Sequence, residues 1–168
     1  MRDALRVAQV RGTAIFSAMT SPGSAPVAET VITVRTPELD SFGHVNHAVF
    51  LNYLEHARYL ALEEAGFAWS SLDEHSWQIF VVRIEVDYLA EATRGDALLI
   101  RTWADSFRRT TMVLAQEIVR AEESDTVVAR ARVTAVWIGP DGRPCASRNM
   151  SAKDCRSGQP RRGSDLCR

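Results

Sequence analysis

Apolar and polar residues follow two different periods along the chain, and these periods predict the order of its elements. Residues 30–36 alternate as a strand does and stop at Pro37. Over residues 47–65 the apolar positions recur at steps of three and four, which predicts one long helix with a buried stripe. The stripe consists of Phe50, Tyr53, Leu54, Ala57, Leu60, Ala61 and Ala65.

The residues that flank this segment fit the two ends of a helix. Asn46 is a suitable N-cap because its side-chain oxygen can accept a backbone N–H of the first turn. Gly66 suits the position just after the last turn, where the backbone often turns left-handed. We therefore expect the helix to begin at about His47 and to end at about Ala65.

Four strands are predicted after the helix, at residues 80–88, 97–106, 111–121 and 126–138. In the first, Phe80, Val82, Ile84, Val86 and Tyr88 form one face, which we expect to be buried. The second and third should form a hairpin through residues 107–110. The alanines of the last strand permit close approach to a helix, which suits a strongly curved sheet.

Short connections make the last four strands antiparallel neighbours in this prediction, with the single helix covering the face that they share. The predicted fold is α+β, a hotdog fold in which a curved antiparallel five-stranded sheet wraps a long central helix. We expect the domain to span residues 29–150. Residues 1–28 and 151–168 are polar or rich in turn formers and are predicted to be tails, and the sequence leaves open whether the native start is Met1 or Met19.

Composition excludes several classes of function. The 168 residues are 46% hydrophobic and 24% charged with a formal net charge of −1, which indicates one soluble domain and no general binding to nucleic acid. No apolar run reaches the ~20 residues that cross a bilayer, and no secretory signal is evident. The three cysteines at 145, 155 and 167 are odd in number, so we expect free thiols and a cytoplasmic protein.

The candidate chemistry lies just ahead of the helix. Asp40 and Gly43 occupy a short loop that leads to the helix start near His47. A helix N-terminus presents unpaired N–H donors and a partial positive charge, which suit the oxygen of an acyl group, and a nearby carboxylate can act as base or nucleophile. This arrangement suggests acyl transfer, although an Asp in such a loop is more often a cap or turn residue.

The run Asp40-x-x-Gly-His-Val-Asn-His-Ala-x-Phe-Leu-x-Tyr-Leu-Glu-x-Ala-Arg58 resembles the hotdog-fold acyl-CoA thioesterases. It is most similar to the branch of long-chain acyl-CoA thioesterase III and 4-hydroxybenzoyl-CoA thioesterase, over about residues 30 to 150. A weaker likeness continues at Tyr88 and through Ala92 to Leu98, with Glu91 where many relatives have proline.

The resemblance implies that Asp40 is the catalytic base or nucleophile and that the backbone N–H of His47 polarises the thioester carbonyl. The His47 imidazole then either takes part or merely lines the site. Gly43, Asn46 and Glu55 are expected to support the helix start. Predicted substrate contacts come from Phe50, Tyr53, Arg108 and Arg109.

Several of these residues also have a simpler interpretation. Glu55 and Arg58 could pair on the helix surface, and Arg108 and Arg109 could form only a solvated hairpin tip instead of binding the nucleotide of coenzyme A. The histidines at 44, 47 and 56 are too widely spread for a metal site, so no metal and no cofactor are expected.

The predicted function is hydrolysis of an acyl thioester, carried by coenzyme A or by acyl carrier protein, to a free acid and a thiol. Two subunits or four are expected to assemble, because relatives build each site at a dimer interface. The alternatives are a hotdog hydratase or dehydratase and a non-catalytic acyl-thioester binding protein. Acyl chain length, and an aromatic or aliphatic acyl group, are not determined by the sequence.

Overall fold

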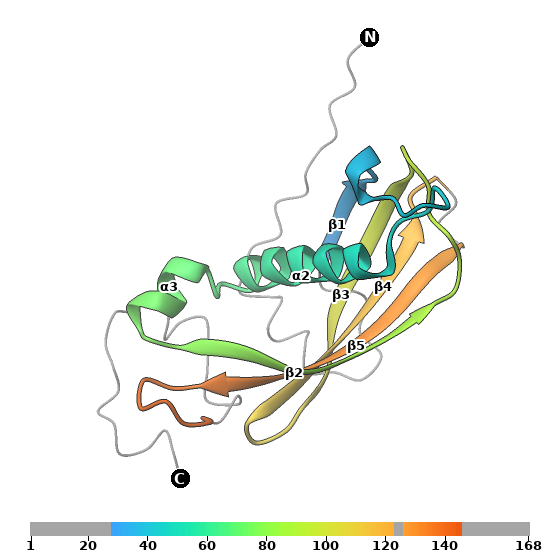
Figure 1. The fold of residues 1–168 in the computed structure, drawn as a ribbon. Coiled ribbons are helices and arrows are strands. Elements are labelled where there is room, and N and C mark those ends of the chain that lie inside the picture. The colour runs from blue at the N-terminus through green and yellow to red at the C-terminus, as the bar shows by residue number, and fades with distance from the viewer. Residues whose placement is uncertain (1–27, 123–125, 146–168) are drawn as a thin grey trace.

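One long helix lies across a five-stranded antiparallel sheet, which confirms the predicted α+β class (Figure 1). The computed structural model describes residues 28–122 and 126–145. Most of both predicted tails, with Cys155 and Cys167, lies outside these residues. The elements in chain order are β1 (Ala28–Thr33), the 3-10 helix η1 (Thr36–Glu38), α2 (His47–Glu64), α3 (Trp69–Glu74), β2 (Gln78–Tyr88), β3 (Ala97–Phe107), β4 (Thr111–Arg120) and β5 (Val127–Ile138).

The order of the strands differs from the predicted one. The sheet runs β1-β3-β4-β5-β2, so β2 pairs with β5 and not with β3, and β1 takes the place beside β3. The expectation that the last four strands are successive neighbours is wrong. Residues 89–96 can reach about 28 Å when extended, whereas three strand spacings are only about 14 Å, so this connection is long enough to cross the end of the sheet.

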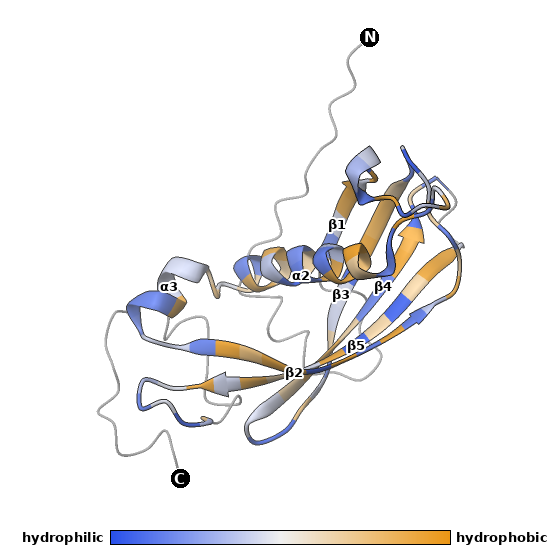
Figure 2. Cartoon of the chain, in the orientation of Figure 1, coloured by the Kyte–Doolittle hydropathy of each residue, from blue (hydrophilic) through white to orange (hydrophobic). Residues whose placement is uncertain are grey.

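The predicted burial of one face of β2 is also wrong for the single chain. Phe80, Val82, Ile84 and Tyr88 are exposed, and only Val86 is half-buried. One reason is the register shift between Val81 and Arg83, since before it Ile79, and not Phe80, packs against the core; the other is the position of β2 at the edge of the sheet. Figure 2 shows apolar residues along the first part of this edge strand.

The helix was predicted well. Its N-cap is Asn46, whose Oδ1 accepts the N–H of Ala48 at 2.9 Å, and Gly66 follows it with a φ of 89°. The stripe faces the core as expected, apart from Leu60, which is half-buried.

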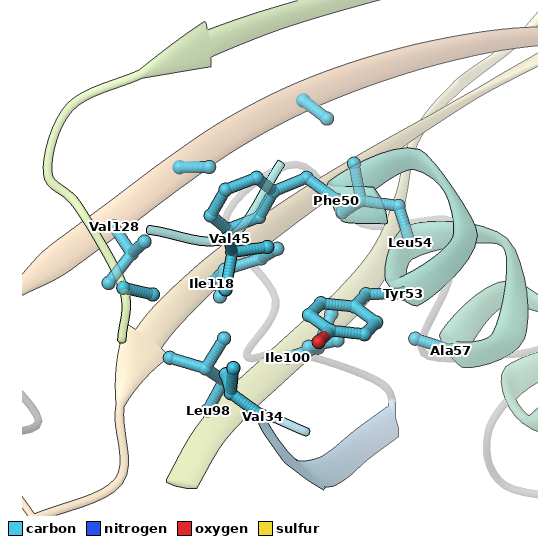
Figure 3. Close-up of a cluster of buried hydrophobic side chains, with 13 residues drawn as sticks. Val34, Val45, Phe50, Tyr53, Leu54, Ala57, Leu98, Ile100, Ile118 and Val128 are labelled. Carbon is cyan, nitrogen blue, oxygen red and sulfur yellow. The ribbon is translucent and has the colours of Figure 1, made fainter. Parts of the chain in front are cut away.

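The core beneath α2 has two parts along the helix. Phe50, Tyr53 and Leu54 pack on residues of β3, β4 and β5 near the start of the helix, among them Leu98 and Ile118 (Figure 3). A second cluster lies under the C-terminal half of α2 and under α3. It contains Ala65, Phe67, Leu72, Met112, Leu114, Val133, Ala135, Trp137 and Cys145. The helix start is thus held over one end of the sheet and α3 over the other.

Candidate active site

Asp40 is held in a tight turn just before the helix. Its Oδ1 accepts the backbone N–H of Phe42 at 2.8 Å and that of His44 at 3.2 Å, and its carbonyl accepts the N–H of Gly43 at 3.2 Å. Gly43 has a φ of 83°, a left-handed conformation that glycine adopts without strain. Asp40 is therefore a turn residue, as the simpler interpretation had it. Among the described residues, however, no hydrogen bond uses its Oδ2.

The first backbone donor of α2 is available beside this turn. No described residue accepts the N–H of His47, whose side chain is exposed. Its carbonyl accepts the hydroxyl of Tyr88 at 2.9 Å, which ties the helix start to the end of β2. The residue before it, Asn46, donates its N–H to the carbonyl of Glu38 at 3.0 Å. An unused N–H at a helix N-terminus is a suitable donor to a carbonyl oxygen that gains negative charge.

The buried carboxylate of Glu38 holds the segment before α2 to the helix and to Arg35. Glu38 accepts the Tyr53 hydroxyl at 2.6 Å, the Arg35 backbone N–H at 2.6 Å and the Arg35 guanidinium at 2.6 Å. Burial alone would raise the pKa of Glu38, but these hydrogen bonds outweigh it and lower the pKa below its ordinary value. Burial and the same carboxylate raise the pKa of Tyr53 far above its ordinary value, so the phenol stays protonated and donates.

The crossing segment 89–96 packs against the same loop. The N–H of Val45 donates to the carbonyl of Ala92 at 2.8 Å, and His44 pairs with Thr93 in an isolated antiparallel β-bridge. The His44 imidazole lies 3.4 Å from the carboxylate of Glu91. Arg120 fixes the segment from β4 through the carbonyl of Glu91, at 2.7 Å. The turn that carries Asp40 is therefore braced on two sides.

A cavity of about 380 Å³ opens under the second half of α2, and its wall is mostly apolar. It is lined by Glu55, Arg58, Tyr59, Leu62, Glu63, Phe67, Trp69, Leu72, Ile79, Val81, Met112, Leu114, Val133 and Ala135. The helix supplies the first five of these, and β2, β4 and β5 supply the last six. The cavity therefore lies between the helix and the sheet, where an acyl group can be enclosed.

The simpler interpretation of Arg58, a pair with Glu55 on the helix surface, does not hold. Only 8% of Arg58 is exposed, and its Nη1 donates to Oε1 of Gln116 at 2.9 Å. Burial lowers the pKa of Arg58 below its ordinary value. Gln116, itself 1% exposed, donates in turn to the carbonyl of Leu54 at 3.0 Å and to the hydroxyl of Thr102 at 2.9 Å. The sequence did contain a signal for this burial, since Arg58 stands four residues after Leu54 and therefore on the apolar stripe of the helix.

The predicted substrate contacts are not gathered in one place. Phe50 and Tyr53 are 4% and 5% exposed, pack edge to face at 6.2 Å in the core, and do not line the cavity. Glu55 is exposed on the helix, in the cavity wall. Arg108 and Arg109 are exposed at the tip of the β3–β4 hairpin, as expected. Their roles, like those of Asp40 and His47, stay predictions.

Two further features of the described residues bear on function. In residues 28–122 and 126–145 there is no group of three His, Cys, Asp or Glu side chains placed to hold a metal ion. In the same ranges no helix is long and apolar enough to cross a membrane.

Comparison with known proteins places the chain in a family. Residues 34–154 match the model of the thioesterase-like superfamily. The chain is 34% identical over 111 residues to the long-chain acyl-CoA thioesterase FadM of Escherichia coli, which covers 66% of this chain and 82% of FadM. It is 26% identical over 124 residues to the chloroplastic acyl-acyl carrier protein thioesterase ATL2 of Arabidopsis thaliana, covering 74% of this chain and 65% of ATL2.

Among solved structures, the chain is similar to the probable thioesterase YbaW of Escherichia coli. The two share 30% identity and a TM-score of 0.66, over 77% of this chain and 96% of YbaW. Fold, motif and these matches agree, and the chain belongs to the thioesterase-like superfamily of hotdog proteins. It is a thioester hydrolase, as the sequence predicted.

We predict that Tyr53→Phe lowers the free energy of unfolding by about 1–3 kcal/mol at neutral pH, because the buried Glu38 carboxylate loses a donor. The contribution of Glu38 depends on its lowered pKa, so it is complete above the unfolded pKa and is lost as pH falls through the folded one. The difference between the variant and the wild type should therefore shrink below about pH 4. Urea unfolding at several pH values measures it. A difference that is independent of pH would contradict this account, and Tyr59→Phe, at a side chain that is 45% exposed, is the control.

Proposed function

We propose that this thioester hydrolase cleaves acyl-CoA to a free carboxylic acid and coenzyme A, with Asp40 and the start of α2 as its catalytic groups. One observation carries the proposal. A carboxylate that a turn holds in place, with one oxygen unused among the described residues, stands directly before a helix whose first N–H is also unused. Hydrolysis of a thioester needs these two functions, a base or nucleophile and an oxyanion donor.

The chemistry follows from the two groups. The thioester carbonyl accepts the N–H of His47, and the carbon is attacked by a water that Asp40 deprotonates or by Asp40 itself. The carbonyl electrons move onto oxygen, where the N–H and the partial positive charge of the helix start stabilise the anion. When the carbonyl re-forms, the carbon–sulfur bond breaks and the thiolate takes a proton. If Asp40 attacks, the resulting anhydride is hydrolysed by water in a second step.

Coenzyme A is the carrier that we favour. FadM, with 34% identity, acts by its name on acyl-CoA, whereas ATL2, with 26%, acts by its name on acyl carrier protein. The exposed Arg108 and Arg109 suit phosphates, since guanidinium groups bind phosphate oxygens in pairs. The acyl part is proposed to enter the cavity beneath α2, whose wall is largely apolar.

The length of β3 argues against a contact of Arg108 and Arg109 with coenzyme A bound at the Asp40 site of their own subunit. The beginning of β3 lies next to the helix start, because the N–H of Val34 donates to the carbonyl of Asp96, and His44 bridges to Thr93. At ~3.3 Å per residue, the 11 residues of β3 carry the chain roughly 33 Å from there to the hairpin tip. Figure 1 shows the tip and the loop before α2 at opposite ends of these strands. We therefore propose that Arg108 and Arg109 contact coenzyme A bound at a partner subunit.

A homodimer is proposed to form through the free edge of β2. Phe80, Val81 and Val82 are 52%, 45% and 59% exposed there, and an exposed apolar edge strand is a surface that proteins normally cover. Pairing two β2 strands would join the sheets of two subunits. The dimer, an assembly of two dimers, the domain limits 29–150 and a cytoplasmic location remain predictions of the sequence.

The first test replaces the proposed base. Asp40→Asn keeps an oxygen that can accept the N–H groups of Phe42 and His44, so the turn and the assembly should survive. Turnover of acyl-CoA should fall by about 10²–10⁴, the usual contribution of a positioned base. Thiol release reports the rate, and light scattering reports assembly. Near-normal turnover in Asp40→Asn would rule out the mechanism, and tight binding of acyl-CoA by a wild type that releases no thiol would indicate a binding protein.

The second test concerns assembly. Val82→Lys introduces a charge on the β2 edge at an exposed position, so the single chain should stay folded while the dimer dissociates. Sedimentation or light scattering should show a monomer, and activity should fall with it because the site lacks its partner contacts. The control is Val31→Lys on the β1 edge, where 61% of the side chain is exposed. An active monomer would contradict the shared site.

The third test concerns the hairpin arginines. Arg108→Ala with Arg109→Ala should raise KM for acyl-CoA more than it lowers kcat, and should have no effect on an N-acetylcysteamine thioester, which lacks the nucleotide. If these residues act across subunits, mixing the double variant with Asp40→Asn should create dimers with one intact site. At a substrate concentration well below the KM of the wild type, activity should then recover toward about one quarter of the wild type, from the half of all dimers that are mixed. Absence of recovery would show that each subunit uses its own arginines.

A further inference from the structure

The cavity beneath α2 contains a charge that an ordinary acyl chain cannot use. The charged residues in its mostly apolar wall are Arg58, Glu55 and Glu63, and Arg58 is the one of the three that is buried. Only one hydrogen bond of the Arg58 guanidinium is made to a described residue, from Nη1 to Gln116. A guanidinium carries five N–H donors, so donors of this cavity-lining residue remain available.

Filling this cavity with a saturated chain would have a cost. The chain would displace the water that the remaining Arg58 donors can bind, and it offers no acceptor in return. A buried donor without a partner is unfavourable, and more so when it is charged. A chain with an oxygen at the right place would avoid this cost and would gain a charge-assisted hydrogen bond.

We propose that the cavity selects acyl groups that carry an uncharged oxygen, a hydroxyl or a keto group, in their distal half, where it accepts a hydrogen bond from Arg58. This inference deepens the proposed thioesterase function and rests on it for the carrier and for the placement of the acyl chain. Arg58 is then a specificity-determining residue that touches the substrate and takes no part in the bond cleavage.

The charges around the cavity favour a neutral oxygen over a carboxylate. Glu55 lies close enough to stabilise the positive charge of Arg58, and Glu63 lies in the same wall. A carboxylate on the acyl chain would meet these two like charges as well as Arg58. A hydroxyl or keto oxygen has no such repulsion.

The position of the oxygen follows from the geometry of α2. Arg58 stands 11 residues after His47, which is close to three turns, so the two residues lie on one face of the helix about 16 Å apart. Helical side chains lean toward the N-terminus, which brings the guanidinium back to about 10 Å at the nearest. An extended chain advances at most about 1.2 Å per bond, a third of the ~3.6 Å of an extended residue. The oxygen therefore belongs roughly eight to fourteen bonds from the reacting carbon.

Binding of thioethers tests the inference without requiring catalysis. S-dodecyl-CoA and its terminally hydroxylated analogue have no scissile thioester, and their affinities for the full-length wild type can be compared by calorimetry. We expect the hydroxylated compound to bind about fivefold more tightly or better. An analogue with the hydroxyl on the third carbon should bind no better than S-dodecyl-CoA, and neither should one with a terminal carboxylate. Equal affinities for the first two compounds, or tighter binding of the carboxylate, would overturn the inference.

Variants locate the effect. Arg58→Met keeps an unbranched apolar stem, two atoms shorter, and removes the donors, so the preference for the hydroxyl should disappear while S-dodecyl-CoA binds as well as before or better. Arg58→Lys should retain part of the preference, and Arg143→Met, in the exposed loop after β5, should retain all of it. A preference that persists in a folded Arg58→Met would refute the assignment. If Arg58→Met does not fold, the wild-type comparison of the analogues decides alone.

The two proposals fail in different ways. A wild type that releases thiol from acyl-CoA but binds the hydroxylated and plain thioethers equally retains the proposed function and loses this inference. A wild type that prefers the hydroxylated thioether but releases no thiol from any acyl-CoA loses the proposed function, and the oxygen-selective cavity stands.

Discussion

The placement of α2 on the sheet is the constraint on which the rest of the structure depends. An apolar stripe by itself permits a helix to slide or rotate over a smooth sheet. Two buried polar contacts on one side of α2 prevent this: Tyr53 donates to Glu38, and Arg58 donates to Gln116. Each contact has a narrow range of length and direction, and a buried polar group that loses its partner is costly. Together they fix the helix in one register.

The position of the helix start depends on this register of α2 on the sheet. Because Glu38 accepts both the Tyr53 hydroxyl and, through its carbonyl, the N–H of Asn46, the core and the N-cap share one residue. The turn of Asp40 is then set by its own hydrogen bonds and by the segment 89–96 beside it. The site is exposed, yet its geometry depends on groups that are buried. This is how the Asp40 carboxylate and the backbone N–H of His47 can be held in place.

The sheet separates two tasks along its length. Near the start of α2 the core is filled by aromatic and branched side chains, which gives the proposed catalytic groups a rigid base. Toward α3 the packing leaves a cavity with a polar group in its wall. Under the proposed function, one end is rigid for the reaction and the other is open for the acyl group, which is a sensible division because catalysis requires fixed geometry whereas acyl recognition requires volume.

The sequence by itself determined the parts of this protein that local periodicity and a dense motif encode. The bounds of α2, its N-cap at Asn46, the hairpin of β3 and β4, the α+β class and the family all follow from residues close together in the chain. The tertiary structure decided what depends on distant partners. It placed β2 beside β5 at an exposed edge and buried Arg58 against Gln116, 58 residues further on. It also set the hairpin arginines far from Asp40. The alternation of apolar and polar residues in a strand does not indicate which strand it pairs with. Nor does the sequence around a charged residue show that a distant side chain will form a buried hydrogen bond with it.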